Sequence, residues 1–395
     1  MEKAKKRPVY LDYAAATPCD PRVIDEMVSC LKIDGTFANP HSKDHVYGWE
    51  AAEVVEQARE RVADLIGVSP LEVIFTSGAT EANNLAIMGL ARALKQNGDG
   101  RRHIITSMIE HKAVLEACDA LEQEGFEVTR LKPSKEGLIS PKQVEEAMTP
   151  STFLVSIAQA NSVLGSVSDV HAIAKIVRER GAYFHTDTAQ SAGYVRTAFD
   201  SSEISMATLT SEKICGPKGV GALYIKRAHK VPLMPLIMGG GQEKGLRGGT
   251  VPTHEVAGMG KAFEIMGKQG EADARRISSL RQRLEKAVAG IPGSLINGSS
   301  EHRVPGILSV SFKNIDGRKL LPELSAYVAA SAGSACSSSD LKPSYVLTAV
   351  GLDDDLARAS LRLSLGRYTT PQEIDEAAAA IAMVVKKLRG EGAQP

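Results

Sequence analysis

Between about residues 50 and 225, the apolar positions alternate between the spacing of helices and that of short strands. In residues 51–66, apolar side chains such as Val54, Val55, Ala58, Val62 and Leu65 fall on one helical face. Helical patterns also cover residues 81–94 and 171–180, whereas β-rich runs occupy 73–75, 103–106, 127–131, 153–157, 183–186 and 222–225. This alternation predicts a mostly parallel sheet wrapped by helices, with ligands bound beyond the carboxyl ends of the strands.

The pattern changes after residue 239, where glycines at 239–241 and 248–249 are too frequent for a packed element. A helical pattern at 273–288, a strand pattern at 307–312 and a helical pattern at 373–388 follow. We therefore expect an α/β protein with a large domain at 16–265. A smaller α+β domain would combine residues 1–15 with 266–395 and carry a mobile loop at 331–342.

The composition of the 395-residue chain is ordinary for a globular protein, with 43% hydrophobic and 24% charged residues. Because 47 basic residues balance 47 acidic ones, direct binding to nucleic acid or to an anionic membrane is not expected. No apolar run approaches the roughly 18 residues of a membrane span, and the N-terminus lacks the features of a signal peptide. The five scattered cysteines predict a reducing, cytoplasmic location without a disulfide framework or a structural metal.

Residues 76–81 follow a predicted strand and open a predicted helix. Their small side chains would let backbone N–H groups approach an anion at the positive end of the helix. The Gly-Lys-Ser/Thr ending of a Walker loop is absent. The segment is equally compatible with an ordinary helix cap formed by Ser77 or Thr80.

Three further residues extend this chemistry. Asp187 ends a predicted strand and could face a ring nitrogen, although capping a helix is the commoner role of such an aspartate. Lys213 precedes a glycine-rich turn, where desolvation would favour a Schiff base with an aldehyde, although most lysines are surface charges. The order of phosphate cradle, aspartate and lysine is what pyridoxal phosphate requires. Cys336 lies in a small-residue stretch that predicts an exposed, reactive position, whereas the other four cysteines are expected to be inert.

Taken together, these motifs resemble the cysteine desulfurases of the NifS/IscS type. These are fold-type I pyridoxal-phosphate enzymes within the class-V aminotransferase group. The similar segments run in order along nearly the whole chain, at 10–18, 35–40, 76–81, 110–114, 216–224, 239–250, 331–347 and 363–367. The Ser-Ala-Cys-Ser sequence around Cys336 resembles the subgroup whose long loop hands sulfur directly to several partner proteins.

The resemblance implies that Lys213 binds pyridoxal 5'-phosphate covalently and moves the Cα proton of the substrate, L-cysteine. His111 would stack on the cofactor and handle the thiol proton, and Cys336 would take the sulfur as a persulfide while alanine leaves. The implied cofactor ligands are Ala79, Thr80, His111, Asn161, Asp187, Gln190, Thr210, Glu212, Lys213 and Thr250. The implied substrate ligands are Asn39, Asn161 and Arg362, whose guanidinium would clamp the carboxylate. Thr250 would reach across from a second subunit, which implies a homodimer with shared active sites.

The chain departs from the family pattern at two places. Glu212 stands where the family has a histidine that donates to the phosphate, and because a carboxylate repels a phosphate we expect Glu212 to point away or to contact it only through its backbone. The family segment His-x-Asn-Asn-Glu corresponds to residues 159–163, of which Asn161 alone is kept while Ser162 and Val163 differ. We expect both changes to affect the grip on the cofactor and the rate rather than the fold.

Other functions stay open on the sequence alone. The same scaffold serves aminotransferases and selenocysteine lyases, although Cys336 argues against both. A degenerate scaffold that binds sulfur-relay partners without turnover is an alternative from another class. The sulfur acceptor could belong to iron–sulfur assembly, tRNA thiolation or DNA phosphorothioation.

Overall fold

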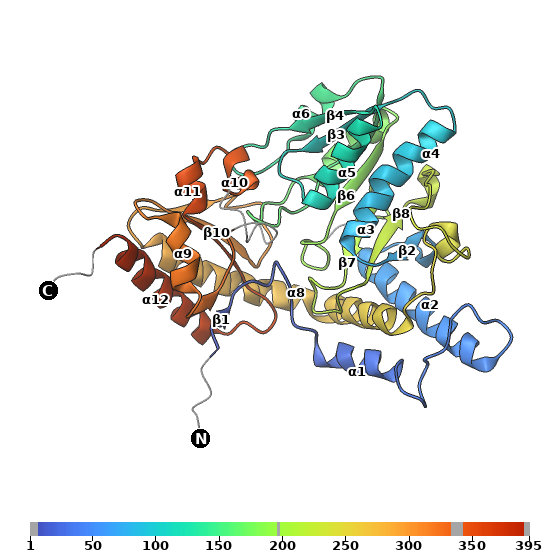
Figure 1. Cartoon of the computed structure of the whole chain (residues 1–395), viewed down its shortest axis with the longest axis horizontal. Coiled ribbons are helices and arrows are strands. Elements are labelled where there is room, and N and C mark those ends of the chain that lie inside the picture. Colours follow the sequence, from blue (N-terminus) through green and yellow to red (C-terminus); the bar gives the residue numbers. More distant parts are fainter. Residues whose placement is uncertain (1–6, 196–197, 333–342, 391–395) are drawn as a thin grey trace.

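A sheet of seven strands forms the larger part of the computed structural model, which describes residues 7–195, 198–332 and 343–390 (Figure 1). The strands lie in the order β2-β8-β7-β6-β5-β3-β4. Among the described strands of this sheet, β8 alone runs in the direction opposite to the others. Their bounds are β2 (Val73–Thr76), β3 (His103–Ser107), β4 (Glu127–Leu131), β5 (Thr152–Ser156), β6 (Tyr183–Asp187), β7 (Met206–Thr210) and β8 (Gly221–Ile225). The predicted mostly parallel sheet is confirmed.

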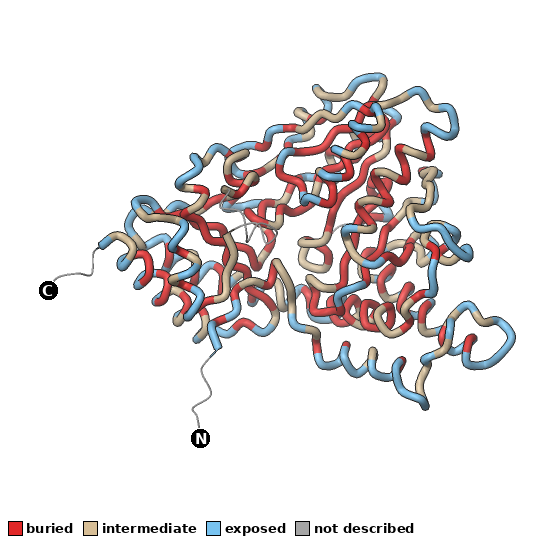
Figure 2. Tube along the Cα trace, viewed as in Figure 1, coloured by how far each residue is buried: buried red, intermediate tan, exposed pale blue. Residues whose placement is uncertain are grey.

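Helices cover both faces of this sheet, as their apolar sides require. One face packs against α2 (Val46–Ile66), α6 (Pro141–Ala147) and α7 (Val170–Glu179), and the other against α3 (Ala79–Asn84), α4 (Leu90–Gln96) and α5 (Lys112–Gln123). A π-helical turn at Leu85–Gly89 joins α3 to α4. The helix α1 (Pro21–Ser29) packs along the outside, against α8. Figure 2 shows the strands as the most continuously buried part of the chain.

A second core surrounds a smaller antiparallel sheet of order β12-β10-β9. Its strands are β9 (Ser294–Asn297), β10 (Ile307–Phe312) and β12 (Ser360–Ser364), while β1 (Val9–Tyr10) pairs in parallel with β11 (Val328–Ala329). The helices on this side are α9 (Gly317–Leu324), α10 (Tyr345–Ala349), α11 (Asp354–Arg358) and α12 (Pro371–Leu388). We refer to the elements around this second core as the small-sheet unit. It brings Arg362, in the middle of β12, next to the larger sheet.

The helix α8 (Thr253–Ala289) belongs to both cores and is much longer than the predicted 273–288. Its first half contains glycines, which argue against a helix on propensity alone. Packing explains them, because a Cβ on Gly260 would lie 2.6 Å from Cα of Ala58 and one on Gly258 would lie 2.7 Å from Cγ of Met27. Since α8 passes residue 265 without a break, the predicted domain boundary there stays a prediction.

Candidate active site

A cavity of about 390 Å³ lies at the carboxyl ends of the central strands, against the small-sheet unit. Its lining unites most of the residues predicted for the site, namely Ala79, Thr80, His111, Asn161, Asp187, Gln190, Thr210, Glu212, Lys213 and Arg362. Among the described residues, Asn39 and Thr250 are exposed and lie outside this lining. Cys336 and most of the predicted loop at 331–342 lie outside the described residues. The roles of these three residues stay predictions.

The N-terminus of α3 forms one wall of the cavity. In the described part of the chain, no side chain caps this end of the helix, and the preceding Gly78 has a φ of 147°. The first backbone N–H groups of α3, at Ala79 and Thr80, therefore face the cavity without the usual side-chain acceptor. Such a helix end favours an anion.

A buried carboxylate lines the same cavity and contacts the next turn of α3. Asp187 ends β6 and is 8% exposed, and its Oδ2 accepts a hydrogen bond from Nδ2 of Asn83 over 2.7 Å. Its Oδ1 accepts from the backbone N–H of Ala189 over 2.9 Å. These two donors hold the carboxylate in a fixed orientation. Asn83 lies one helical turn beyond Thr80, and no motif in the sequence singled it out.

The candidate lysine lies in the same cavity with its ammonium held by two acceptors. Nζ of Lys213 donates to the backbone oxygen of Ala15 over 2.6 Å and pairs with Oε1 of Glu212 over 2.8 Å. The side chain of Glu212 is thus turned toward the lysine, and how it lies relative to a phosphate stays a prediction. The attraction of the neighbouring ammonium explains this orientation.

Arg362 is nearly buried and engaged on two of its nitrogens. Nη2 pairs with Oδ1 of Asp12 over 2.9 Å, and Nη1 donates to the backbone oxygen of Ser162 over 3.1 Å. Among the described residues, its Nε has no hydrogen-bond partner. A buried guanidinium with a spare donor is suited to bind a carboxylate. Asp12 belongs to one of the family-like segments, but its pairing across 350 residues could not be anticipated.

Two turns meet beside the cavity and carry His111 and Asn161. His111 caps the N-terminus of α5, and its Nδ1 accepts from the backbone N–H of Ala113 over 3.1 Å, which leaves Nε2 for a ligand. Nδ2 of Asn161 donates to the backbone oxygen of Ile109 over 2.8 Å, so the amide holds the two turns together. Asn161 thus has a structural contact besides the ligand role predicted for it.

Glu110 is a fully buried carboxyl between these turns. Its Oε1 accepts from the hydroxyl of Ser107 over 2.6 Å, and its Oε2 accepts from the backbone N–H of Ala158 over 2.9 Å. Burial raises the pKa of Glu110 to about 8, although both hydrogen bonds lower it. At neutral pH the group is therefore mostly protonated. Its position directly before His111 was the only signal in the sequence.

We expect Glu110→Gln to flatten the pH dependence of stability. An unfolded glutamate has a pKa of about 4.3, so between there and about 8 the folded chain holds a proton that the unfolded chain has lost. The free energy of unfolding should then fall as pH rises, by up to about 1.4 kcal/mol per unit from this one group. Urea unfolding of the cofactor-free chains at several pH values measures both slopes. Parallel curves for the wild type and the variant would contradict the raised pKa.

The chemistry of the cavity fits a ligand that carries a phosphate, a basic ring nitrogen and an aldehyde. The open N-terminus of α3 suits the phosphate, the carboxylate of Asp187 suits the protonated ring nitrogen, and the amine of Lys213 suits the aldehyde. Pyridoxal phosphate has all three groups. Among the described residues, no cluster of three side chains is arranged to hold a metal, and no helix is both long and apolar enough to cross a membrane.

Comparison with known proteins gives consistent findings. The model of the family described as aminotransferase class-V matches residues 9–377. Over 384 residues the chain is 48% identical to the cysteine desulfurase IscS of Tolumonas auensis, covering 97% of this chain and 94% of that protein. A solved NifS-like protein superposes with a TM-score of 0.88 at 35% identity, covering 96% of this chain and all of that one. A structure described as SspA in complex with cysteine gives a TM-score of 0.81 at 40% identity, covering 91% of this chain and 99% of that one.

Proposed function

The chain belongs to the class-V aminotransferase family, and on that premise we propose that it is a pyridoxal-phosphate-dependent cysteine desulfurase. In the proposed reaction, L-cysteine and the thiol of Cys336 yield L-alanine and a persulfide on Cys336. The C–S bond of the substrate breaks and an S–S bond forms, so the sulfur is oxidised while the carbon is reduced and protonated. The observation that carries the proposal is the meeting of Lys213, Asp187 and Arg362 around one cavity next to an open helix N-terminus.

In this proposal, pyridoxal phosphate supplies an electron sink that makes the substrate's Cα proton acidic. Lys213 would take and return that proton, because its amine lies in the same cavity as the carboxylate of Asp187, which would hold the ring. Arg362 holds the substrate carboxylate, for which a guanidinium is the suitable donor. His111 stands at the mouth of the cavity with Nε2 available to move the proton of the substrate thiol.

The experiment that tests the function is direct. The purified protein, loaded with pyridoxal phosphate and given L-cysteine and a thiol reductant, should release alanine and sulfide in equal amounts. An aminotransferase would instead form a keto acid and need an amino acceptor. A degenerate scaffold would release neither product, and either result would reject the proposal.

Glu212 should weaken the hold on the cofactor. A histidine at this position could donate to the phosphate, whereas an ionised glutamate only accepts. We predict that Glu212→His favours the bound cofactor by about 1–3 kcal/mol and slows its loss on dialysis, with activity unchanged or higher. The control Glu212→Ala removes the carboxylate without adding a donor and so separates repulsion from donation. Faster loss in both variants would show that the ion pair with Lys213 is itself beneficial.

We also infer a homodimer with shared active sites. Nearly half of the large apolar side chains exposed in the described chain lie between residues 24 and 49, including Ile33, Phe37 and Trp49. Exposed apolar surface of this extent is typical of an interface. The segment also contains Asn39, which a partner chain would bring to a cavity that it does not reach in its own chain.

Complementation between two impaired chains tests the shared site. Lys213→Ala and Thr250→Ala chains, mixed and reassociated, should form heterodimers in which one site is wild type at both positions. Alanine release should then rise above that of either chain alone. No rise, despite exchange of subunits confirmed by mass spectrometry, would place Thr250 outside the partner's site.

The protein therefore takes L-cysteine as its substrate, and the finer assignments follow from the same proposal. The sulfur acceptors are proteins whose thiols receive the terminal sulfur of the Cys336 persulfide, which returns Cys336 to a thiol. The four cysteines that the structure describes are unpaired, which suits a reducing compartment such as the cytoplasm.

A further inference from the structure

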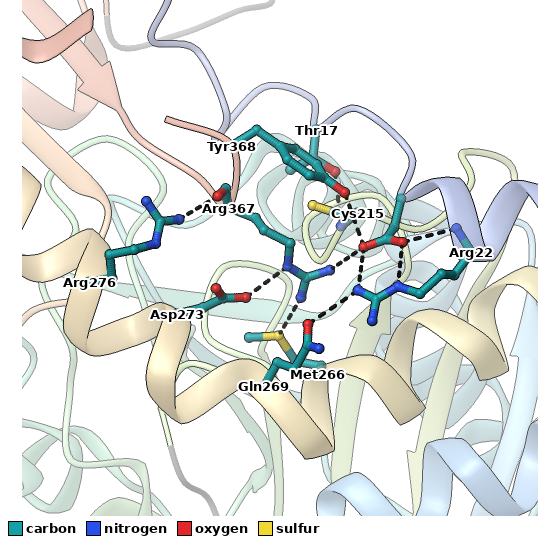
Figure 3. A network of polar contacts seen from close by, with 10 residues as sticks. Thr17, Arg22, Cys215, Met266, Gln269, Asp273, Arg276, Arg367 and Tyr368 are labelled. Carbon is teal, nitrogen blue, oxygen red and sulfur yellow. Dashed lines mark hydrogen bonds and ion pairs between the residues drawn. The ribbon is translucent and has the colours of Figure 1, made fainter. Parts of the chain in front are cut away.

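A buried network of charged side chains joins the N-terminal segment, α8 and the chain just after β12 (Figure 3). Arg367 donates through Nη1 to Oδ2 of Asp20 over 3.0 Å and through Nε to Oδ2 of Asp273 over 2.8 Å. Asp20 also accepts from Arg22 over 2.8 Å and from the hydroxyl of Tyr368 over 3.0 Å. The side chains of Arg367 and Asp20 are 7% and 3% exposed, so water does not screen this pair as it would on the surface.

The same N-terminal segment, at residues 17–20, also holds the turn at residues 212–215. We call this the lysine turn because it carries Lys213. The hydroxyl of Thr17 donates to the backbone oxygen of Glu212 over 2.5 Å and accepts from the backbone N–H of Cys215 over 3.1 Å. The backbone N–H of Asp20 donates to the oxygen of Cys215 over 2.8 Å. Both ends of the lysine turn are therefore fixed to one short segment, and that segment ends at the residue that binds Arg367.

The backbone at Cys215 shows why the turn needs such support. Its φ is 64°, in the left-handed region that side chains other than glycine seldom adopt. A strained residue of this kind persists only where the surrounding contacts hold it. Cys215 lies two positions after the reactive Lys213, and the contacts that hold it come from Thr17 and Asp20.

Arg362 lies on β12, and Arg367 lies three residues after the end of that strand. Arg276 of α8 adds to this connection, because it donates to the backbone oxygens of Arg367 and Thr369. Asp20 thus joins the segment that contains Arg362 and Arg367 to the lysine turn.

We propose that Arg367 and Asp20 are positioning residues that couple the small-sheet unit, with its substrate clamp Arg362, to the lysine turn. This inference rests on the proposed function, because it assigns the network a part in that reaction. Arg367 bridges Asp20 and Asp273, Asp20 fixes Cys215, and the turn keeps the amine of Lys213 in the cavity. Substrate binding itself depends on Arg362 and not on this network.

The test uses Arg367→Lys in the full-length protein. Lysine keeps the positive charge between the two carboxylates, but a single ammonium cannot reproduce the fork that bridges them. A misplacement of a reactive group by about 1 Å can lower the rate by about 100-fold, so we expect kcat to fall about 10- to 100-fold while KM for cysteine stays unchanged. The matched control is Arg283→Lys, which alters an exposed ion pair that also joins α8 to the small-sheet unit, through Asp375. It should change neither constant.

A second readout does not depend on activity. In the cofactor-free chain, an amine-reactive ester labels lysines, and peptide mass spectrometry gives the labelling rate of Lys213 relative to the exposed Lys218. We expect this ratio to rise several-fold in Arg367→Lys and to stay at the wild-type value in Arg283→Lys. If Arg367→Lys does not fold, Asp273→Asn removes one of the two carboxylates and is measured in the same way.

The outcomes are distinct. An unchanged labelling ratio in a folded variant overturns the coupling, whether or not the wild type releases alanine. A rise in KM with kcat unchanged also overturns it, because the network would then act on substrate binding. A changed ratio in a protein that never releases alanine keeps the coupling and rejects the proposed function.

Discussion

Replacing Lys213 with alanine should abolish both the covalent attachment of pyridoxal phosphate and the release of alanine from cysteine. Loss of one acid–base group costs about 10²–10⁴-fold in rate, and Lys213 supplies the attachment as well, so the fall should be about 10⁴-fold or more. The structure supports this because the ammonium is drawn into the cavity by the oxygens of Ala15 and Glu212. Loss of the visible absorbance after dialysis and loss of borohydride-reducible cofactor measure the attachment.

Two other lysines are suitable controls for this prediction. Lys218, in the next turn, is exposed, and Lys218→Ala should leave attachment and turnover unchanged. Lys112 begins α5 and is among the residues that line the cavity, but it is exposed to solvent. Lys112→Ala should therefore retain the covalent cofactor. Attachment that survives in Lys213→Ala and disappears in either control would move the reactive amine to that position.

Much of this site could be predicted because it follows the carboxyl ends of parallel strands. The alternation of apolar patterns placed Thr80 after one strand and Asp187 after another, and strands in a parallel sheet end at the same edge. The structure places both residues around one cavity for that reason. A local pattern thus predicted that two residues far apart in the sequence lie around one cavity, because the geometry of a parallel sheet is regular.

Contacts between distant segments without a regular pattern could not be predicted. Asp12 meets Arg362 because the N-terminal segment crosses to β12, and the backbone oxygen of Ala15 meets Lys213 through the same crossing. The direction of Glu212 depends on that arrangement too, since the held ammonium attracts its carboxylate. Sequence spacing contains no information on such crossings, which tertiary packing alone determines.

The second large effect concerns the sulfur-accepting thiol. Burial raises the pKa of Cys118 to about 12 and also raises the pKa values of Cys19 and Cys215. These three thiols are therefore mostly protonated at neutral pH, and a thiolate is the form that attacks. Cys30 is buried. Of the cysteines that the structure describes, none is suited to the reaction, which favours Cys336 as the nucleophile.

Cys336→Ser should therefore separate the two halves of the reaction. Cofactor attachment and cysteine binding should be kept, because they depend on Lys213, Asp187 and Arg362, and the absorbance change on adding cysteine should report them. Alanine formation should fall by about 10³-fold or more, because removal of a covalent nucleophile removes the step itself. Cys19→Ser, at the described cysteine that is only partly buried, is the control and should keep full activity. Substantial turnover by Cys336→Ser without added thiol would show that the substrate sulfur is accepted by another group.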